Sequence, residues 1–242
     1  MLIEDENNEA RNIKANLARV SQQVEQCVQQ YKREPGSVRL LAVSKTKPLS
    51  ALEAAYVAGQ RAFGENYVQE AVDKFHALSH LPDIEWHFIG PIQSNKSRLI
   101  AETMHWVHSI DRDKIARRLS EQRPDNLPPL NVCIQVNISD EDSKAGVSLV
   151  ELNDMVALVA ELPNLRLRGL MAIPAPQDNH DAQCAVYDPL AKAFVELSQS
   201  DSMVDTLSIG MSGDLPAAIQ SGSTMVRVGT AIFGERNYST TT

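Results

Sequence analysis

Apolar positions along the chain fall into two patterns. From about residue 4 to residue 33 they recur at helical spacing among polar residues, at Ile13, Leu17, Val20, Val24 and Cys27. The pair Pro35-Gly36 then ends this predicted helix, because proline and glycine interrupt regular structure. After residue 36 the pattern changes to short apolar runs separated by amphipathic stretches.

Eight such runs follow, and each has the length and composition of a strand. They cover 38–43, 61–64, 86–89, 106–110, 132–138, 165–173, 206–211 and 225–232. Helices are expected after the first seven runs, at 50–58, 67–79, 94–104, 112–122, 150–161, 181–198 and 215–220. Strands that alternate with helices indicate a parallel α/β protein, and eight units favour a closed barrel over an open doubly wound sheet. We therefore predict an α/β fold, a single (β/α)8 TIM barrel with an N-terminal helical extension. The one domain would span 1–242, with the helix in 1–36 and the barrel in 37–238.

Composition narrows the functional classes. With 23 basic and 31 acidic residues the formal net charge is -8, which argues against a general nucleic-acid binder. No apolar stretch approaches the roughly 18 residues of a membrane span, and the acidic, polar N-terminus does not resemble a secretory signal. The three cysteines, Cys27, Cys133 and Cys184, have no metal-like spacing. We expect a cytoplasmic protein without a metal or a membrane partner.

Polar residues at the ends of the predicted strands are the candidates for chemistry, because barrels of this kind carry their sites there. Lys45 follows a wholly apolar strand. Its amine would enter the barrel mouth, where desolvation lowers a lysine pKa and favours Schiff-base chemistry; the alternative is that it extends to solvent. Lys47 is the weaker candidate, because Pro48 places it in the loop. Asn66, after the second run, would either contact a ligand or cap the next helix.

The last two strands carry a second group of candidates. Ser212 follows the seventh run, and Gly229 and Thr230 lie in the eighth. Barrels often bind phosphate between these loops through backbone N–H groups and hydroxyls. Arg227 alternates with outward-facing valines and points inward, either toward a ligand or into a structural ion pair. A strand-end lysine together with an anion site predicts a phosphorylated aldehyde cofactor.

Other motifs are better explained by structure than by function. His87 is expected to be a satisfied core residue, and the pair His76 and His80 to lie on a solvated helix face. A basic region near the barrel rim is also expected to be solvated; it comprises Lys96, Arg98, Arg112, Lys114, Arg117 and Arg118.

Six segments taken together resemble the pyridoxal phosphate homeostasis protein family. They are LLAVSKTKP at 40–48, FGENY at 63–67, WHFIGPIQSNK at 86–96, RGLM at 168–171, SIGMS at 208–212 and VRVGTAIFGER at 226–236. The resemblance runs from about residue 38 to residue 238. One departure follows Ser212, where Gly213-Asp214-Leu215 replaces the family's usual acidic residue and methionine.

The resemblance implies a monomeric barrel like the N-terminal domain of alanine racemase, with pyridoxal 5'-phosphate (PLP) as the cofactor. The family's Schiff-base lysine corresponds to Lys45, and its pyridine-nitrogen partner to Arg227. The phosphate site corresponds to Ser212, Gly229 and Thr230, and Asn66 lies in the motif near the cofactor.

We expect the chain to be a PLP carrier rather than an enzyme. It would act in intracellular PLP homeostasis, hold PLP as a lysine aldimine without appreciable turnover and deliver it to PLP-dependent apo-enzymes. Arg227 would leave the ring nitrogen unprotonated and the ring a poor electron sink. Alanine racemase also draws a tyrosine from a second domain, and only eight residues follow Gly234 here. The alternatives are a weak PLP-dependent amino-acid racemase and a barrel enzyme that forms a Schiff base with a sugar phosphate.

Overall fold

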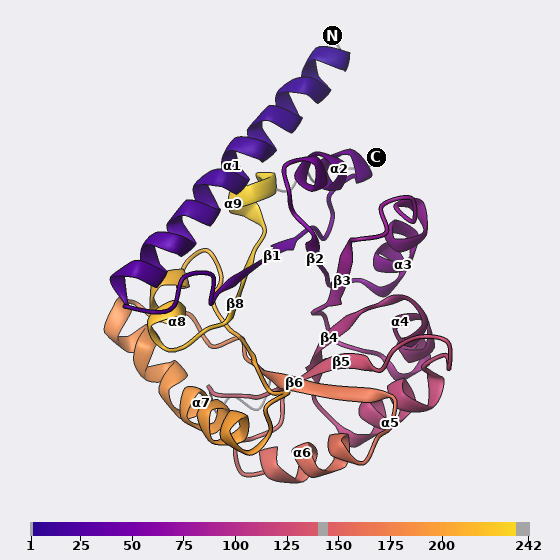
Figure 1. Ribbon diagram of the computed structural model, residues 1–242, viewed down its shortest axis with the longest axis vertical. Coiled ribbons are helices and arrows are strands. Elements are labelled where there is room, and N and C mark those ends of the chain that lie inside the picture. Colours follow the sequence, from indigo (N-terminus) through magenta and orange to yellow (C-terminus); the bar gives the residue numbers. More distant parts are fainter. Residues whose placement is uncertain (1, 140–144, 236–242) are drawn as a thin grey trace.

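Eight parallel strands close into a barrel in the computed structural model, which describes residues 2–139 and 145–235. Each strand pairs with the next along the chain, and the last pairs with the first (Figure 1). The predicted (β/α)8 barrel is therefore confirmed. The strands are β1 (Arg39–Val43), β2 (Ala62–Glu65), β3 (Glu85–Phe88), β4 (Trp106–Ile110), β5 (Leu130–Gln135), β6 (Leu165–Met171), β7 (Thr206–Ser208) and β8 (Met225–Val228).

Helices surround this barrel (Figure 1). They are α1 (Leu2–Gln30), α2 (Leu49–Val57), α3 (Val68–Ala77), the 3-10 turn η1 (Ser94–Lys96), α4 (Ser97–Thr103), α5 (Asp113–Gln122), α6 (Leu152–Ala160), α7 (His180–Ser200), α8 (Leu215–Gln220) and α9 (Thr230–Phe233). The apolar face of each long helix packs on the outward face of the strands, so that Leu52, Ile115 and Leu190 are fully buried. One large core between strands and helices results.

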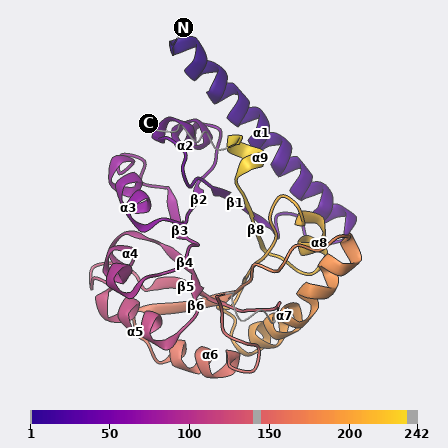
Figure 2. The same cartoon turned by 180° about the vertical axis from the view of Figure 1, so that it is seen from behind.

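The N-terminal helix α1 lies across one side of the barrel, beside α8 and α9 (Figures 1 and 2). It buries the five apolar side chains whose spacing predicted it. Asn16 Nδ2 donates to the carbonyl of Ile232 over 3.1 Å, and an Arg33 nitrogen donates to the carbonyl of Ile219 over 3.1 Å. The extension is thus joined to the last two units of the barrel by packing and by hydrogen bonds.

The eighth strand is shorter than expected. It ends at Val228 rather than at residue 232, and the helix α9 replaces its second half. The carbonyl of Gly229 accepts hydrogen bonds from the N–H groups of Ile232 and Phe233, which turns the chain out of the sheet. The fifth, sixth and seventh strands also end early, at Gln135, Met171 and Ser208. The residues predicted to carry function after β7 and β8 therefore lie on loops and a helix start.

The barrel interior contains two small apolar clusters, separate from the large core. One holds Leu41, Ala62, Ile89 and Met225, and the other holds Trp106, Cys133 and Met171. Side chains alternate between the two faces of a strand, which is why these residues turn inward while their neighbours join the large core.

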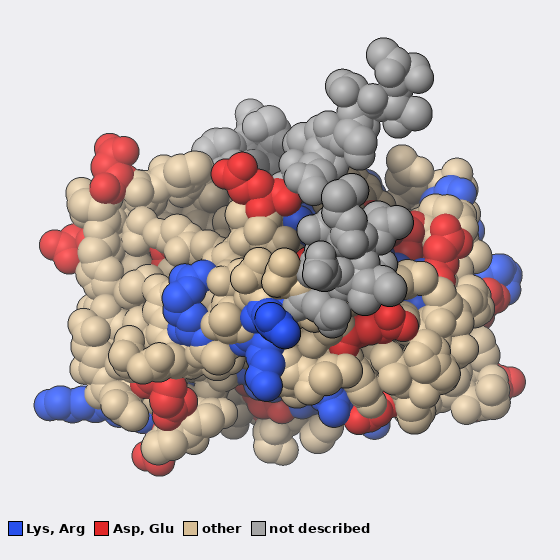
Figure 3. Space-filling model, turned by 90° about the horizontal axis from the view of Figure 1, so that it is seen from above, with Lys and Arg blue, Asp and Glu red and all other residues tan. Residues whose placement is uncertain are grey.

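Charged side chains of both signs are intermingled on the face shown in Figure 3. Within the described ranges, no helix is both long enough and apolar enough to cross a membrane.

Candidate functional site

All six predicted site residues line a single pocket at the carboxyl ends of the strands. Its volume is about 310 Å³. Its walls are formed by Val43, Lys45, Asn66, Ile89, Ile173, Met211, Ser212, Gly213, Arg227, Gly229 and Thr230. The six predicted residues, separated by up to 185 positions, thus lie around one pocket, although their individual roles remain predictions.

Lys45 reaches the pocket through a tight turn after β1. The N–H of Ser44 donates to the carbonyl of Gly64 over 2.9 Å, which continues the pairing of β1 with β2. Thr46 then adopts a positive φ of 64°, and the N–H of Lys47 returns to the carbonyl of Ser44 over 3.0 Å. This turn leaves the half-buried Lys45 on the pocket wall.

Lys47 lies on a different side of the turn. Its Nζ donates to the carbonyl oxygens of Phe233, Gly234 and Glu235 at 3.0, 3.0 and 2.7 Å. The amine therefore holds the segment that follows α9, and it does not line the pocket with Lys45.

A buried ion pair supports the same turn, and sequence analysis missed it. Lys74 on α3 donates from Nζ to the carbonyl of Ser44 at 2.7 Å, to Glu65 Oε1 at 2.8 Å and to Glu70 Oε1 at 2.6 Å. The side chain of Glu65 is fully buried and also accepts from Ser44 Oγ over 2.6 Å. Burial raises the pKa of Glu65, and the nearby Lys74 ammonium partly opposes that shift.

Arg227 is a buried cation on the pocket floor, with only 4% of its surface exposed. Its Nη1 donates to the carbonyl of Ser208 and, over 2.9 Å, to Ser208 Oγ; its Nη2 donates to the carbonyl of Ala172 over 2.9 Å. Among residues 2–139 and 145–235 these partners are neutral oxygens, and no carboxylate lies at ion-pair distance. The ion-pair interpretation of Arg227 is therefore not the arrangement in this structure.

The loop after β7 is held by Asp214, which lies in the segment 213–215 where the sequence departs from the pattern that it resembles. Asp214 Oδ1 accepts from the N–H of Met211 over 2.7 Å, and Oδ2 accepts from the hydroxyl of Tyr187 over 2.6 Å. The helix α8 forms directly after it. The departure thus leaves Ser212 on the pocket wall.

Gly229 lies close to the backbone at the end of β1. A Cβ atom there would lie 3.1 Å from the carbonyl oxygen of Val43 and 3.4 Å from its Cβ. The glycine therefore permits the close approach of the end of β8 to the end of β1. A side chain at residue 229 would press on the backbone of Val43 in β1.

Asn66 carries an unsatisfied polar atom next to the pocket. Its Oδ1 is buried and has no hydrogen-bond partner. Buried polar atoms nearly always have partners, so this oxygen is a candidate acceptor for a group bound beside Asn66. Asn66 also borders a neighbouring pocket of about 800 Å³, whose walls include Lys96 and Arg112 of the basic rim.

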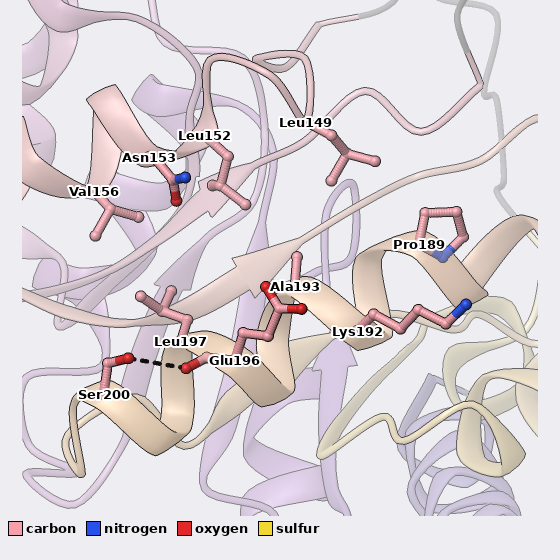
Figure 4. Close-up of a pocket in the computed structure, with 10 residues that line it drawn as sticks. All are labelled: Leu149, Leu152, Asn153, Val156, Pro189, Lys192, Ala193, Glu196, Leu197 and Ser200. Atoms are coloured by element: carbon pink, nitrogen blue, oxygen red, sulfur yellow. Dashed lines mark hydrogen bonds between the residues drawn. The ribbon is translucent and has the colours of Figure 1, made fainter.

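The remaining predictions concern residues outside the pocket. His87 is a satisfied core residue as expected, with both ring nitrogens hydrogen-bonded. His76 and His80 are exposed, and the described part of the chain contains no cluster of three metal-ligating side chains. Figure 4 shows a further hollow of about 440 Å³ between α6 and α7, where none of the six predicted site residues lies.

Comparison with known proteins identifies the structural class of this barrel. The family model described as alanine racemase, N-terminal domain matches residues 11–237. Alanine racemase from Corynebacterium glutamicum superposes with a TM-score of 0.67 over 95% of this chain and 62% of the racemase, at 17% identity. That likeness is one of fold. The chain is thus a barrel of the alanine racemase N-terminal class.

Closer relatives define its place within that class. A pyridoxal phosphate homeostasis protein of Escherichia coli (strain K12) is 57% identical over 230 residues, which cover 94% of this chain and 98% of the relative. PipY of Synechococcus elongatus PCC7942, solved with PLP bound, superposes with a TM-score of 0.80 at 36% identity, over 92% of this chain and 100% of PipY. The chain belongs to the pyridoxal phosphate homeostasis protein family, which confirms the resemblance found in its motifs.

Proposed function

We propose that this protein binds PLP in the Lys45 pocket and takes part in PLP homeostasis, holding the cofactor and delivering it to apo-enzymes without turning over amino acids. The observation that carries the proposal is the convergence of all six predicted residues on one pocket. The Escherichia coli relative is named for PLP homeostasis and PipY was solved with PLP bound, so PLP is the cofactor that we assign to this chain.

The pocket has a suitable group for each part of PLP. The amine of Lys45 would form a Schiff base with the aldehyde. Ser212 and Thr230 offer hydroxyls to the phosphate, and the first N–H groups of a helix such as α9 have no partner within the helix. The side chains of Val43, Ile89 and Ile173 provide apolar walls for the ring.

Arg227 is the reason that we expect no turnover. Bound PLP would supply a ring that withdraws electrons from a substrate carbon, and it does so well only when its nitrogen is protonated. Burial lowers the pKa of Arg227, yet an arginine remains a charged donor in proteins. A fixed guanidinium opposite the ring nitrogen would keep that nitrogen unprotonated, which leaves the ring a weak electron sink.

Transfer and turnover can be measured on the same PLP-loaded protein. We expect the loaded protein to activate PLP-dependent apo-enzymes, with an equal concentration of free PLP as the control. We also expect no rapid exchange of the Cα hydrogen of alanine in deuterated water. Exchange at rates typical of enzymes, about 1–10³ per second, would replace this proposal with a racemase.

A further inference from the structure

Five polar side chains cross the barrel interior in one continuous series of hydrogen bonds. Arg227 Nη1 lies 2.9 Å from Ser208 Oγ, and Ser208 Oγ lies 2.8 Å from His108 Nδ1. His108 Nε2 lies 2.9 Å from His87 Nδ1, and His87 Nε2 lies 2.7 Å from Glu85 Oε1. Ser208, His108 and His87 are completely buried. The series begins at the pocket and ends at the start of β3.

The two ends of the series determine its direction. Arg227 can only donate, and an ionised Glu85 can only accept. His87 must therefore carry its proton on Nε2 and accept at Nδ1, and His108 must donate from Nε2 and accept at Nδ1. The hydroxyl of Ser208 accepts from Arg227 and donates to His108. Every link then has one donor and one acceptor.

The electrostatic surroundings support this arrangement. Burial lowers the pKa of His87 and lowers that of His108 well below its usual value, which favours the neutral form of both rings. Burial opposes ionisation of Glu85, but the hydrogen bond from His87 and the charge of Arg39 lower its pKa. The titratable and charged groups that act on the two imidazoles are Glu85 on β3, Arg39 on β1, His105 before β4 and Arg227 on β8.

Packing fixes the orientation of the rings. The indole of Trp106 stacks on His87 with 5.3 Å between centroids and 12° between planes. It also lies 5.9 Å from the ring of His108. Two neutral imidazoles held by one indole can keep a single tautomer each, because rotation of either ring would break buried hydrogen bonds.

We propose that Ser208, His108 and His87 are positioning residues for the cofactor pocket, forming a one-directional hydrogen-bond relay that holds the Arg227 guanidinium in place between the pocket and Glu85. This inference rests on the proposed function, because Arg227 matters to the cofactor only if PLP occupies the pocket. Without the relay, Arg227 would keep its bonds to the carbonyl oxygens of Ser208 and Ala172. It would lose the hydrogen bond to Ser208 Oγ, which connects it to Glu85 on the far side of the barrel.

The first test uses the protein without cofactor. In 15N NMR spectra of imidazole-labelled protein, His87 and His108 should both be neutral Nε2–H tautomers between pH 6 and pH 8. Assignment comes from His87→Gln and His108→Gln variants. An Nδ1–H tautomer or a charged ring at either histidine would be incompatible with the proposed order of donors and acceptors. The proposal would then be wrong.

The second test compares two buried serines. Ser208→Ala removes the relay hydroxyl, whereas Ser223→Ala removes a fully buried hydroxyl that donates to the carbonyl of Ile209 over 2.8 Å and lies outside the relay. Ser208→Ala should weaken PLP binding about tenfold, since a hydrogen bond to a charged group contributes on that order. It should also shift the absorption band of the bound cofactor. Ser223→Ala should leave both the affinity and the band close to wild type.

The outcomes separate the two proposals. If the wild-type protein fails to bind PLP, the proposed function is wrong and the positioning role falls with it, whatever the tautomers are. If the wild type binds PLP but Ser208→Ala behaves like Ser223→Ala, PLP binding stands and the relay is only structural. A band shift confined to Ser208→Ala supports the relay, because a general loss of stability would affect both variants.

Discussion

The Nζ atom of Lys74 lies 2.7 Å from the carbonyl oxygen of Ser44, the residue immediately before Lys45. A buried ion pair between α3 and the end of β2 therefore holds the backbone from which the candidate Schiff-base lysine projects. Lys74 also has Glu65 as its partner, and Glu65 is fully buried. The position of Lys45 thus depends on a charge that lies outside the pocket.

Lys74→Met should destabilise the protein by about 3–5 kcal/mol, because removing one partner leaves a buried charge uncompensated. Lys114→Met, at an exposed lysine on α5, is the control and should have little effect. Burial already raises the pKa of Glu65 above 4.5, and loss of Lys74 would raise it further. The native state would then bind a proton more readily than the unfolded chain, so the destabilisation should shrink as the pH is lowered from neutral toward 4.5.

Chemical denaturation at several pH values measures this effect. A double variant, Glu65→Gln with Lys74→Met, should recover part of the stability, since both buried charges of this ion pair are removed. If Lys74→Met were no less stable than Lys114→Met at neutral pH, the ion pair would not support the turn.

Thr230→Val should weaken the binding of PLP about tenfold, because it removes a hydroxyl from the predicted phosphate site while keeping the backbone N–H. Pyridoxal, which lacks the phosphate, is the matched ligand. Its affinity should be much lower than that of PLP in the wild type and unchanged by the substitution. The affinities of the wild type for the two ligands are measured by absorbance titration. If they were equal, the phosphate site could not be assigned to this part of the pocket.

Gly229→Val should lower the thermal stability of the cofactor-free protein as well as its affinity for PLP. The added side chain would press on the backbone of Val43, so the damage does not require a ligand. Gly213→Ala is the control for the melting temperature alone, because a Cβ atom at Gly213 has no neighbour within 4 Å but the residue lines the pocket. A Gly229→Val protein with unchanged melting temperature and lost PLP binding would instead indicate that this glycine makes room for the phosphate.

Arg227→Glu should increase side reactions of bound PLP, because a carboxyl group opposite the ring nitrogen favours its protonation. Exchange of the Cα hydrogen of alanine is the measurement, and wild type is the reference. Since Glu at this position would face the carbonyl oxygens of Ser208 and Ala172, Arg227→Gln provides a neutral variant with a lower risk of misfolding. It should show an exchange rate between those of the wild type and Arg227→Glu.

The barrel could be predicted from sequence because each unit repeats the same short period of apolar residues, and the strand-end rule located the pocket residues. The end of β8 could not be predicted from sequence, because its apolar run continues into α9. Only the hydrogen bonds to the Gly229 carbonyl separate the two elements. His108 and Ser208 lie inside buried strands, and their meeting across the barrel depends on the register of strands far apart in sequence. One signal for this cluster was present in the sequence. Trp106 and His108 are two positions apart, which places both side chains on the same face of β4.

The most direct test of the central claim is to reduce the PLP-loaded protein with borohydride and map the labelled peptide. Reduction makes a Schiff base permanent, and Lys45 is expected to carry the label. Lys47 is the internal control, because its Nζ is bound to three carbonyl oxygens after α9. A label on Lys45 that disappears in Lys45→Ala and persists in Lys47→Ala is the result that we predict. A label on Lys47 with Lys45 unmodified would contradict the assignment of the pocket.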